Sequence, residues 1–181
     1  QLMLAHLPEG QPSPFTHGDR DSAPSFAPDG QMLAFLRPDG KERRQLWLIS
    51  VNGGEARALT SVHSSIGEFA WSPDSRSLAF VADVDPDVLP EDHDLKKNPR
   101  VRVVRRIRYR HDVMGWRGDA HRHIFVIDVC GGAPKQVTEG EGDDSTIAWS
   151  PDGAWIAFVS DRSEDRDTAS YNELYVVPSA G

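Results

Sequence analysis

The sequence predicts an all-β fold, namely a partial β-propeller made of four-stranded antiparallel blades. A five-residue signature occurs three times, as FAPDG from Phe26, WSPDS from Trp71 and WSPDG from Trp149. The first two copies start 45 residues apart, and the third starts 78 residues after the second. A period of about 45 residues, with apolar strand-like runs after each signature, is typical of propeller blades.

One repeat, residues 24–60, contains enough turn signals to separate four strands. The Pro-Asp-Gly segment at 28–30 favours a tight turn, because proline presets φ, aspartate bonds the local backbone and glycine tolerates the exit. Strand-like runs follow at 32–37, 45–51 and 56–60, separated by Pro-Asp-Gly at 38–40 and Asn-Gly-Gly at 52–54. Such short turns join neighbouring strands into hairpins. No segment shows a sustained apolar stripe at helical spacing, so strands are expected throughout.

The repeat divides the chain into four parts. Residues 1–23 are predicted to end one blade, 24–60 to form a complete blade, 61–144 a complete blade with an insertion at about 83–115, and 145–181 an incomplete blade. Alignment of Phe15-Thr16 with Leu59-Thr60 makes residues 2–7 the third strand of the first part. Propellers close with about four to eight blades, so we expect a piece of a larger ring. Unpaired strand edges in such a piece favour self-association.

Composition indicates one ordinary soluble domain, and no cofactor is expected. The chain has 181 residues, of which 38% are hydrophobic and 27% are charged. No apolar run approaches the roughly 18 residues of a membrane span, and residues 1–20 lack the core of a signal peptide. Cys130 is the only cysteine, which excludes an internal disulfide and favours a reducing compartment. We therefore expect a cytoplasmic protein with no membrane partner.

The insertion has an uneven charge distribution. The chain carries a net charge of −8, yet residues 96–110 contribute +8 and contain no acid, and an acidic stretch at 83–94 precedes them. The simplest interpretation is a loop-and-strand excursion whose two halves neutralise each other. A functional interpretation is a cationic face for an anionic group such as a substrate carboxylate, which arginine's planar fork binds well. Nucleic acid is disfavoured as a partner, because the acidic surroundings repel phosphates and too few aromatic residues are present for stacking.

Alternation of residues 101–110 predicts a strand in the insertion, with an arginine-rich face. In the full-length parent protein, Val101, Val103 and Ile107 are expected to pack inward. The predicted substrate-binding residues of the insertion are Arg106, Arg108, Tyr109, Arg110 and Trp116. Trp116 lies outside the repeat and is therefore a candidate to line a cavity, whereas Trp71 and Trp149 occupy the repeat position and are predicted core residues.

Metal binding is not predicted. Histidine and carboxylate side chains suit zinc or iron, and such residues gather near the insertion. They are His111, His121, His123, Asp112 and Asp119. Their spacing matches no diagnostic pattern, and histidines that bond nearby loops are more common.

The signature resembles two families of propeller proteins. It is similar both to the propeller of the periplasmic Tol-system protein and to the N-terminal propeller of the prolyl oligopeptidase family of serine peptidases. Four sequence segments in and after the insertion, in this order along the chain, resemble the acylaminoacyl-peptidase branch of the second family. These segments are RYRHD from Arg108, GWRGD from Gly115, RHIFVIDV from Arg122 and GGAPKQVT from Gly131.

The resemblance implies a parent enzyme in which a propeller screens short peptides by size and an α/β-hydrolase domain carries a Ser-Asp-His triad. No Gly-x-Ser-x-Gly nucleophile elbow occurs in the 181 residues. We therefore expect the chain alone to have no catalytic residue and to be inactive, with the remaining propeller and the hydrolase domain as its partners. The alternative is a free-standing β-propeller module of the Tol-system type that binds a protein.

Overall fold

The computed structural model describes residues 1–5, 8, 10–89, 96, 97, 99, 101, 103, 104, 107, 109–111, 115–168 and 171–181. Within these residues every regular element is a strand, and the sheets are antiparallel. No helix long and apolar enough to cross a membrane occurs in this part of the chain. The all-β prediction is confirmed.

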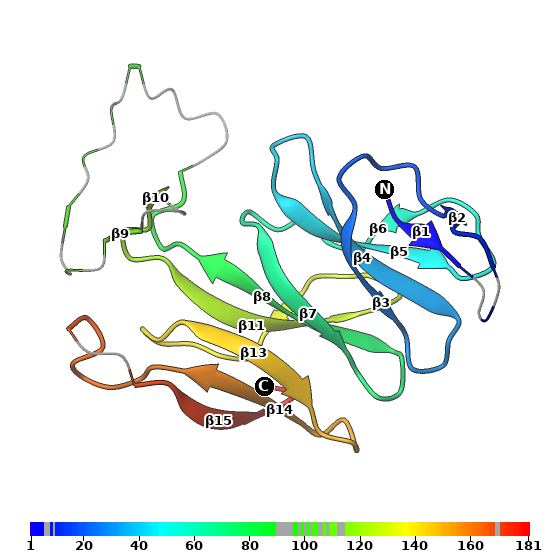
Figure 1. The fold of residues 1–181 in the computed structure, drawn as a ribbon. Coiled ribbons are helices and arrows are strands. Elements are labelled where there is room, and N and C mark those ends of the chain that lie inside the picture. Colours follow the sequence, from blue (N-terminus) through cyan, green and yellow to red (C-terminus); the bar gives the residue numbers. More distant parts are fainter. Residues whose placement is uncertain are drawn as a thin grey trace.

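Three consecutive sheets form the blades, which lie side by side in chain order (Figure 1). Blade 1 contains β3 (Ser22–Phe26), β4 (Met32–Pro38), β5 (Arg44–Ser50) and β6 (Arg57–Ala58). Blade 2 contains β7 (Ile66–Trp71), β8 (Ser77–Val84), β11 (His121–Asp128) and β12 (Lys135–Gln136). Blade 3 contains β13 (Asp144–Trp149), β14 (Trp155–Ser160) and β15 (Glu173–Pro178). Blades 1 and 2 are four-stranded, as predicted, and blade 3 has three strands within the described residues.

The signature forms the turn between the first two strands of each blade. In blade 1 the side chain of Asp29 accepts a hydrogen bond from the backbone N–H of Gln31 at 2.9 Å. Asp74 and Asp152 accept the equivalent bonds in blades 2 and 3. The aspartate of the signature is therefore a turn residue that satisfies backbone donors.

The first residues of the chain make a contact that blades 1 and 2 repeat. The backbone N–H of Leu2 donates to Thr16 Oγ1 at 3.0 Å. Leu46 donates to Thr60 and Ile124 donates to Thr138 in the same way, at 2.9 and 2.8 Å. This equivalence is the one that the alignment of Thr16 with Thr60 predicts. The strands of this part are short, β1 (Met3–Leu4) and β2 (Ser13–Pro14), while residues 6 and 7 of the expected strand lie outside the described residues.

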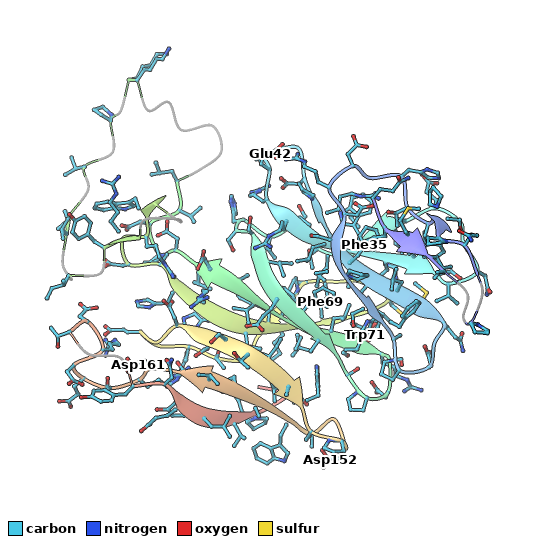
Figure 2. The ribbon with its side chains drawn as sticks, viewed as in Figure 1. Phe35, Glu42, Phe69, Trp71, Asp152 and Asp161 are labelled. Carbon is cyan, nitrogen blue, oxygen red and sulfur yellow. The ribbon has the colours of Figure 1, made fainter. Side chains whose placement is uncertain are left out.

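Three apolar layers hold the blades together, because each strand places alternate side chains on its two faces. The layer between the N-terminal segment and blade 1 contains Leu2, Leu33, Phe35 and Ile49. The layer between blades 1 and 2 includes Leu46, Leu48, Leu78 and Phe80. The layer between blades 2 and 3 contains Ala79, Val81, Ile124, Ile156 and Phe158. Figure 2 shows Phe35 on blade 1 and Trp71 at the end of β7.

The tryptophan of the signature also joins neighbouring blades. Trp71 Nε1 donates to the backbone oxygen of Ser25 at 3.0 Å, and Trp149 Nε1 donates to that of Ala70 at 3.1 Å. Trp71 is 8% exposed and Trp149 packs against the layer between blades 2 and 3, so both predicted core positions hold. Phe26 occupies this position in blade 1, where it has no N–H to donate and is 54% exposed.

The strand expected at 101–110 is wrong for the described residues of that stretch. Only β9 (Arg110–His111) forms there, and it pairs with β10 (Gly115–Trp116). The reason is that β8 and β11 pair directly with each other along their whole lengths, which leaves no place between them for another strand. Val101, Val103 and Ile107 are 84%, 58% and 69% exposed in this chain, and their inward packing in the full-length parent stays a prediction.

The two ends of the blades differ, and this difference positions the candidate site. One end, here called the turn end, carries the signature turns and the short turns after the third strands. The other, here called the insertion end, carries the connection from β8 to β11, which runs from residue 85 to 120. The predicted insertion at about 83–115 lies mostly within this connection.

Candidate functional site

The candidate site is a pocket at the insertion end of blade 2, where β8 ends and the insertion returns to β11. Its volume is about 220 Å³. The lining residues are His63, Ser64, Asp83, Asp85, Val88, Trp116, Arg117 and Ala120. Trp116, which the sequence offers as a candidate cavity residue, is among the lining residues; its role in substrate binding stays a prediction.

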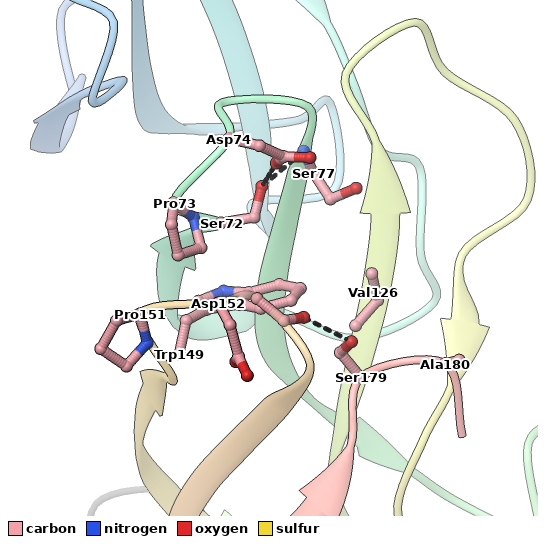
Figure 3. Close-up of a pocket in the computed structure, with 11 residues that line it drawn as sticks. Ser72, Pro73, Asp74, Ser77, Val126, Trp149, Pro151, Asp152, Ser179 and Ala180 are labelled. Carbon is pink, nitrogen blue, oxygen red and sulfur yellow. Dashed lines mark hydrogen bonds between the residues drawn. The ribbon is translucent and has the colours of Figure 1, made fainter.

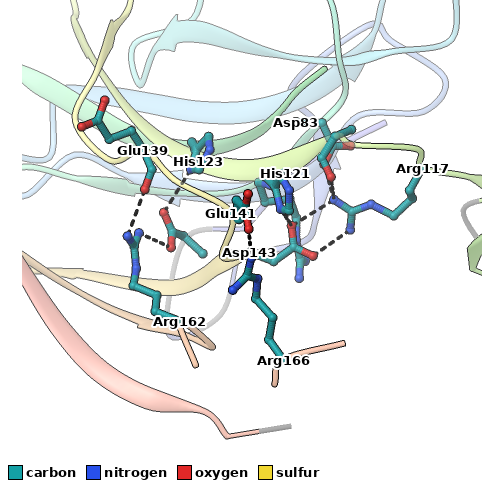
Figure 4. Close-up of polar contacts among 12 residues, drawn as sticks. Asp83, Arg117, His121, His123, Glu139, Glu141, Asp143, Arg162 and Arg166 are labelled. Atoms are coloured by element: carbon teal, nitrogen blue, oxygen red, sulfur yellow. Dashed lines mark hydrogen bonds and ion pairs between the residues drawn. The ribbon is translucent and has the colours of Figure 1, made fainter. Parts of the chain in front are cut away.

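Arg117 fixes the returning segment of the insertion to the blades. Its guanidinium donates to Asp83 at 3.1 Å and to both carboxylate oxygens of Asp143 at 3.0 and 3.1 Å (Figure 4). It also donates to the backbone oxygen of Ala120 at 3.1 Å. The side chain is only 9% exposed. Because Asp83 is the next-to-last residue of β8 and Asp143 precedes β13, one buried cation ties the insertion to blades 2 and 3 together.

The hairpin of β9 and β10 brings three predicted site residues together. Arg110 lies opposite Trp116 in the antiparallel register. The rings of Tyr109 and Trp116 are 5.4 Å apart and tilted by 58°, a geometry typical of favourable aromatic pairs. The backbone N–H of Arg117 donates to the backbone oxygen of Tyr109 at 3.0 Å, which extends the pairing. The other two predicted residues, Arg106 and Arg108, lie outside the described residues.

Sequence reasoning missed the acidic wall of the pocket. Asp83 and Asp85 were noted only as members of an acidic stretch, yet both line the pocket. The available signal was their position: they stand at the end of a predicted apolar strand, immediately before an insertion. Side chains at such a junction lie at the base of any pocket that the insertion helps to enclose.

A second ionic cluster lies at the seam between blades 2 and 3. Asp144, at the start of β13, is fully buried, accepts a bond from Arg162 at 3.0 Å and lies 3.5 Å from His123 Nδ1. Burial raises the pKa of Asp144, but hydrogen bonding to His123 and the charge of Arg162 are among the effects that outweigh burial and hold that pKa below its ordinary value. The carboxylate is therefore charged at neutral pH.

Blade 1 repeats this cluster, which indicates a structural role. Buried Asp21 bonds Arg37 at 2.7 and 2.9 Å. In both blades the guanidinium also stacks on two aromatic rings, over Phe35 and Trp47 in blade 1 and over Phe158 and Tyr175 in blade 3. Blade 2 has the apolar Ile66 in place of the aspartate, and there Phe80 and Phe125 stack directly on each other at 5.4 Å. This pairing of a buried aspartate with an arginine is therefore part of the blade structure and not a ligand site.

The residues of the seam do not form a catalytic triad. Ser160, His123 and Asp144 are close to fully buried, at 1%, 4% and 0% exposure. Within the described residues no hydrogen bond joins the serine to the histidine, which a nucleophile and its base require. In the same part of the chain no three His, Cys, Asp or Glu side chains gather as metal ligands.

A larger pocket of about 500 Å³ lies at the turn end, between the signature turns of blades 2 and 3 (Figure 3). The equivalent place between blades 1 and 2 is bridged by Ser75, whose hydroxyl accepts a bond from the N–H of Asp29 at 3.0 Å. Gly153 replaces Ser75 in the next turn, with φ of 71°. Gly153 has no side chain to form the equivalent bridge between the turns of blades 2 and 3, so the turns that line this pocket lack that bond.

Comparison with known proteins relates the chain to peptidase propellers. An uncharacterized peptidase of Bacillus subtilis, YuxL, is 29% identical over 167 residues, which cover 91% of this chain and 25% of that protein. The solved structure of the Pyrococcus horikoshii acylaminoacyl peptidase is also similar, with a TM-score of 0.72 and 21% identity. The match covers 96% of this chain and 26% of the peptidase chain. The chain is similar to the propeller portion of these peptidases. The predicted resemblance to peptidases of the acylaminoacyl-peptidase type is confirmed.

The same fold also occurs in a TolB protein. The solved putative TolB of Agrobacterium tumefaciens matches 96% of this chain and 48% of its own, with a TM-score of 0.61 and 20% identity. No protein-family model matches the chain. The chain spans about a quarter of the length of the peptidase relatives.

Proposed function

We propose that this chain is the substrate-screening propeller portion of a serine oligopeptidase of the acylaminoacyl-peptidase type, which hydrolyses short peptides in the cytoplasm. The observation that carries the proposal is the sequence match to a peptidase over 91% of the chain. The sequence match to a Tol-Pal system protein TolB covers only 26% of the chain, which favours the peptidase role over that of a general binding module.

The proposed division of labour follows from the residues. The 181 residues contain no nucleophile elbow. In the part of the chain that the structure describes, Ser160, His123 and Asp144 at the seam are buried, and no hydrogen bond joins the serine to the histidine. In this proposal an α/β-hydrolase domain of the parent chain performs acyl transfer. The propeller contributes by limiting which peptides reach that domain and by holding them at the insertion end.

The insertion supplies the groups that would hold a peptide. Arg110 is exposed and lies next to Trp116. No acid pairs with it among the residues that the structure describes, so its guanidinium is available to a carboxylate or a carbonyl oxygen. Arg106 and Arg108 precede it in sequence and belong to the same proposed set. A charged hydrogen bond of this kind contributes about 1.5 to 3 kcal/mol.

Arg110→Ala in the intact parent enzyme tests this role. We expect kcat/KM for short peptides to fall about ten- to a hundredfold, because one charged hydrogen bond to the substrate is lost. The thermal melt should stay unchanged, since the side chain is exposed. Arg44→Ala, at another exposed arginine outside the insertion, is the matched control. Unchanged hydrolysis together with a lowered melting temperature would make Arg110 a structural residue and remove it from the proposed site.

The alternative function is a free-standing module of the Tol-system type. The TolB match favours it, because the chain there covers 48% of the solved protein. The length of the intact gene product separates the two. A parent chain with further blades and a nucleophile elbow supports the peptidase, whereas a protein made only of propeller repeats supports the module.

A further inference from the structure

Among the residues that the structure describes, the lining of the pocket at Trp116 has two carboxylates, Asp83 and Asp85, and one guanidinium, Arg117. Arg117 lies between the carboxylates of Asp83 and Asp143, so its single positive charge is shared by two negative ones. Asp85 adds another carboxylate to the wall, and one of its oxygens accepts the backbone N–H of Asp87 at 2.9 Å. Among the residues that the structure describes, no arginine or lysine pairs with Asp85. The site therefore has acidic groups that its own described cations do not neutralise.

The lining of the pocket also includes an aromatic side chain, Trp116, whose position is fixed by its neighbours. The indole of Trp116 contacts the ring of Tyr109, and the next residue, Arg117, is fixed by its two carboxylates and by the oxygen of Ala120. Val88 adds an apolar group to the lining. An indole face attracts a cation through its quadrupole, and a carboxylate beside it adds a charged acceptor.

We propose that this pocket binds the basic side chain, lysine or arginine, of a peptide. The cationic head pairs with Asp85, and the methylene stem lies along Trp116 and Val88, in the way that long basic side chains cover apolar surface. The pocket of about 220 Å³ has the scale of one long side chain. An acidic side chain is repelled there, and an apolar one leaves the carboxylate of Asp85 desolvated without a partner. This inference rests on the proposed peptide-screening function and adds a side-chain preference to it.

A direct binding measurement on the 181-residue chain tests the inference. The probes are three blocked tripeptides, acetyl-Ala-X-Ala-amide, with lysine, norleucine or glutamate as X. Tryptophan fluorescence and calorimetry follow binding, and the signal from Trp116 is identified with Trp116→Phe. We expect saturable binding of the lysine peptide, no binding of the glutamate peptide, at least about tenfold weaker binding of norleucine, and weaker lysine binding at high salt.

Asp85→Asn isolates the carboxylate, with Asp165→Asn in the exposed loop after β14 as the matched control. The first variant should weaken lysine binding by at least about tenfold, and the second should leave it unchanged, with both folded by thermal melt. Equal affinity for lysine and norleucine, full binding by Asp85→Asn, or no binding at all overturns the inference. Because the assay needs no hydrolysis, its binding result holds even when the parent proves not to be a peptidase. When the lysine peptide does not bind, the side-chain preference is wrong, but the proposed screening role is not contradicted.

Discussion

Thr16, Thr60 and Thr138 perform one task in three successive parts of the chain. Each hydroxyl oxygen accepts a backbone N–H, which belongs to Leu2 before β1, to Leu46 on β5 or to Ile124 on β11. Leu46 and Ile124, which donate these bonds, are fully buried. A buried N–H left without an acceptor costs about 1 to 3 kcal/mol. The threonine is therefore a structural requirement of the blade.

Thr138→Val removes this acceptor with little change of shape. We expect the free energy of unfolding to fall by about 1 to 3 kcal/mol, because the N–H of Ile124 stays buried without a partner. Chemical denaturation measures the change. Thr168→Val, at an exposed threonine in the loop after β14, should change stability by less than about 0.5 kcal/mol. Equal effects of the two substitutions would show that the threonine bond does not stabilise the blade.

At the scale of elements, the tryptophan of each signature connects its own blade to the preceding one. The bond from Trp149 to Ala70 and the bond from Trp71 to Ser25 have the same geometry. Arg57 forms a second connection between blades 1 and 2. It donates to the backbone oxygen of Val129, at the turn that follows the third strand of blade 2. The blades are thus joined by polar contacts as well as by apolar layers.

Trp149→Phe tests the indole bond between blades 2 and 3. Phenylalanine keeps the ring at this position, as Phe26 does in blade 1, but cannot donate. We expect a loss of about 0.5 to 1.5 kcal/mol for the bond, with some further loss from the smaller ring. Trp155→Phe is the control, because Trp155 is 46% exposed. If thermal melts of the two variants coincide, the bond to Ala70 contributes nothing to the seam.

The strands of the blades could be predicted because their signals are local. Turn residues in the signature and alternating apolar runs mark β3 to β6 almost where the structure has them. The strand at 101–110 failed although its residues alternate as well. Alternation describes a strand with one buried face, but it does not supply a neighbouring strand. Here β8 and β11 already pair with each other, a long-range fact that no local pattern contains.

The candidate site could be predicted only in part for the same reason. Trp116 was found because it departs from the repeat, and the hairpin then placed Tyr109 and Arg110 beside it. Asp83 and Asp85 were missed as pocket residues, because the whole insertion separates them from Trp116 in sequence. The contact of Arg117 with Asp83 and Asp143 closes that separation. It joins three segments that the sequence alone does not relate.

At the scale of the molecule, the outer face of blade 3 differs from the equivalent faces of the other blades. Leu174 occupies the place of Leu46 and Ile124, yet it is 74% exposed while they are fully buried. Val176, on the same face, is 64% exposed. Apolar side chains at these positions pack against a following blade in blades 1 and 2. Contact with a further blade fits the proposed larger parent, and self-association through this face stays a prediction.

The most direct test of the account is labelling with a serine-directed fluorophosphonate probe, applied to the 181-residue chain and to the intact gene product. We predict stoichiometric labelling of the intact protein at one serine outside residues 1–181, since the nucleophile belongs to the hydrolase domain. The 181-residue chain should stay unlabelled, with no cleavage of acyl-peptide substrates. Stoichiometric labelling of the 181-residue chain would contradict the non-catalytic role, and an intact protein without any labelled serine would contradict the peptidase parent.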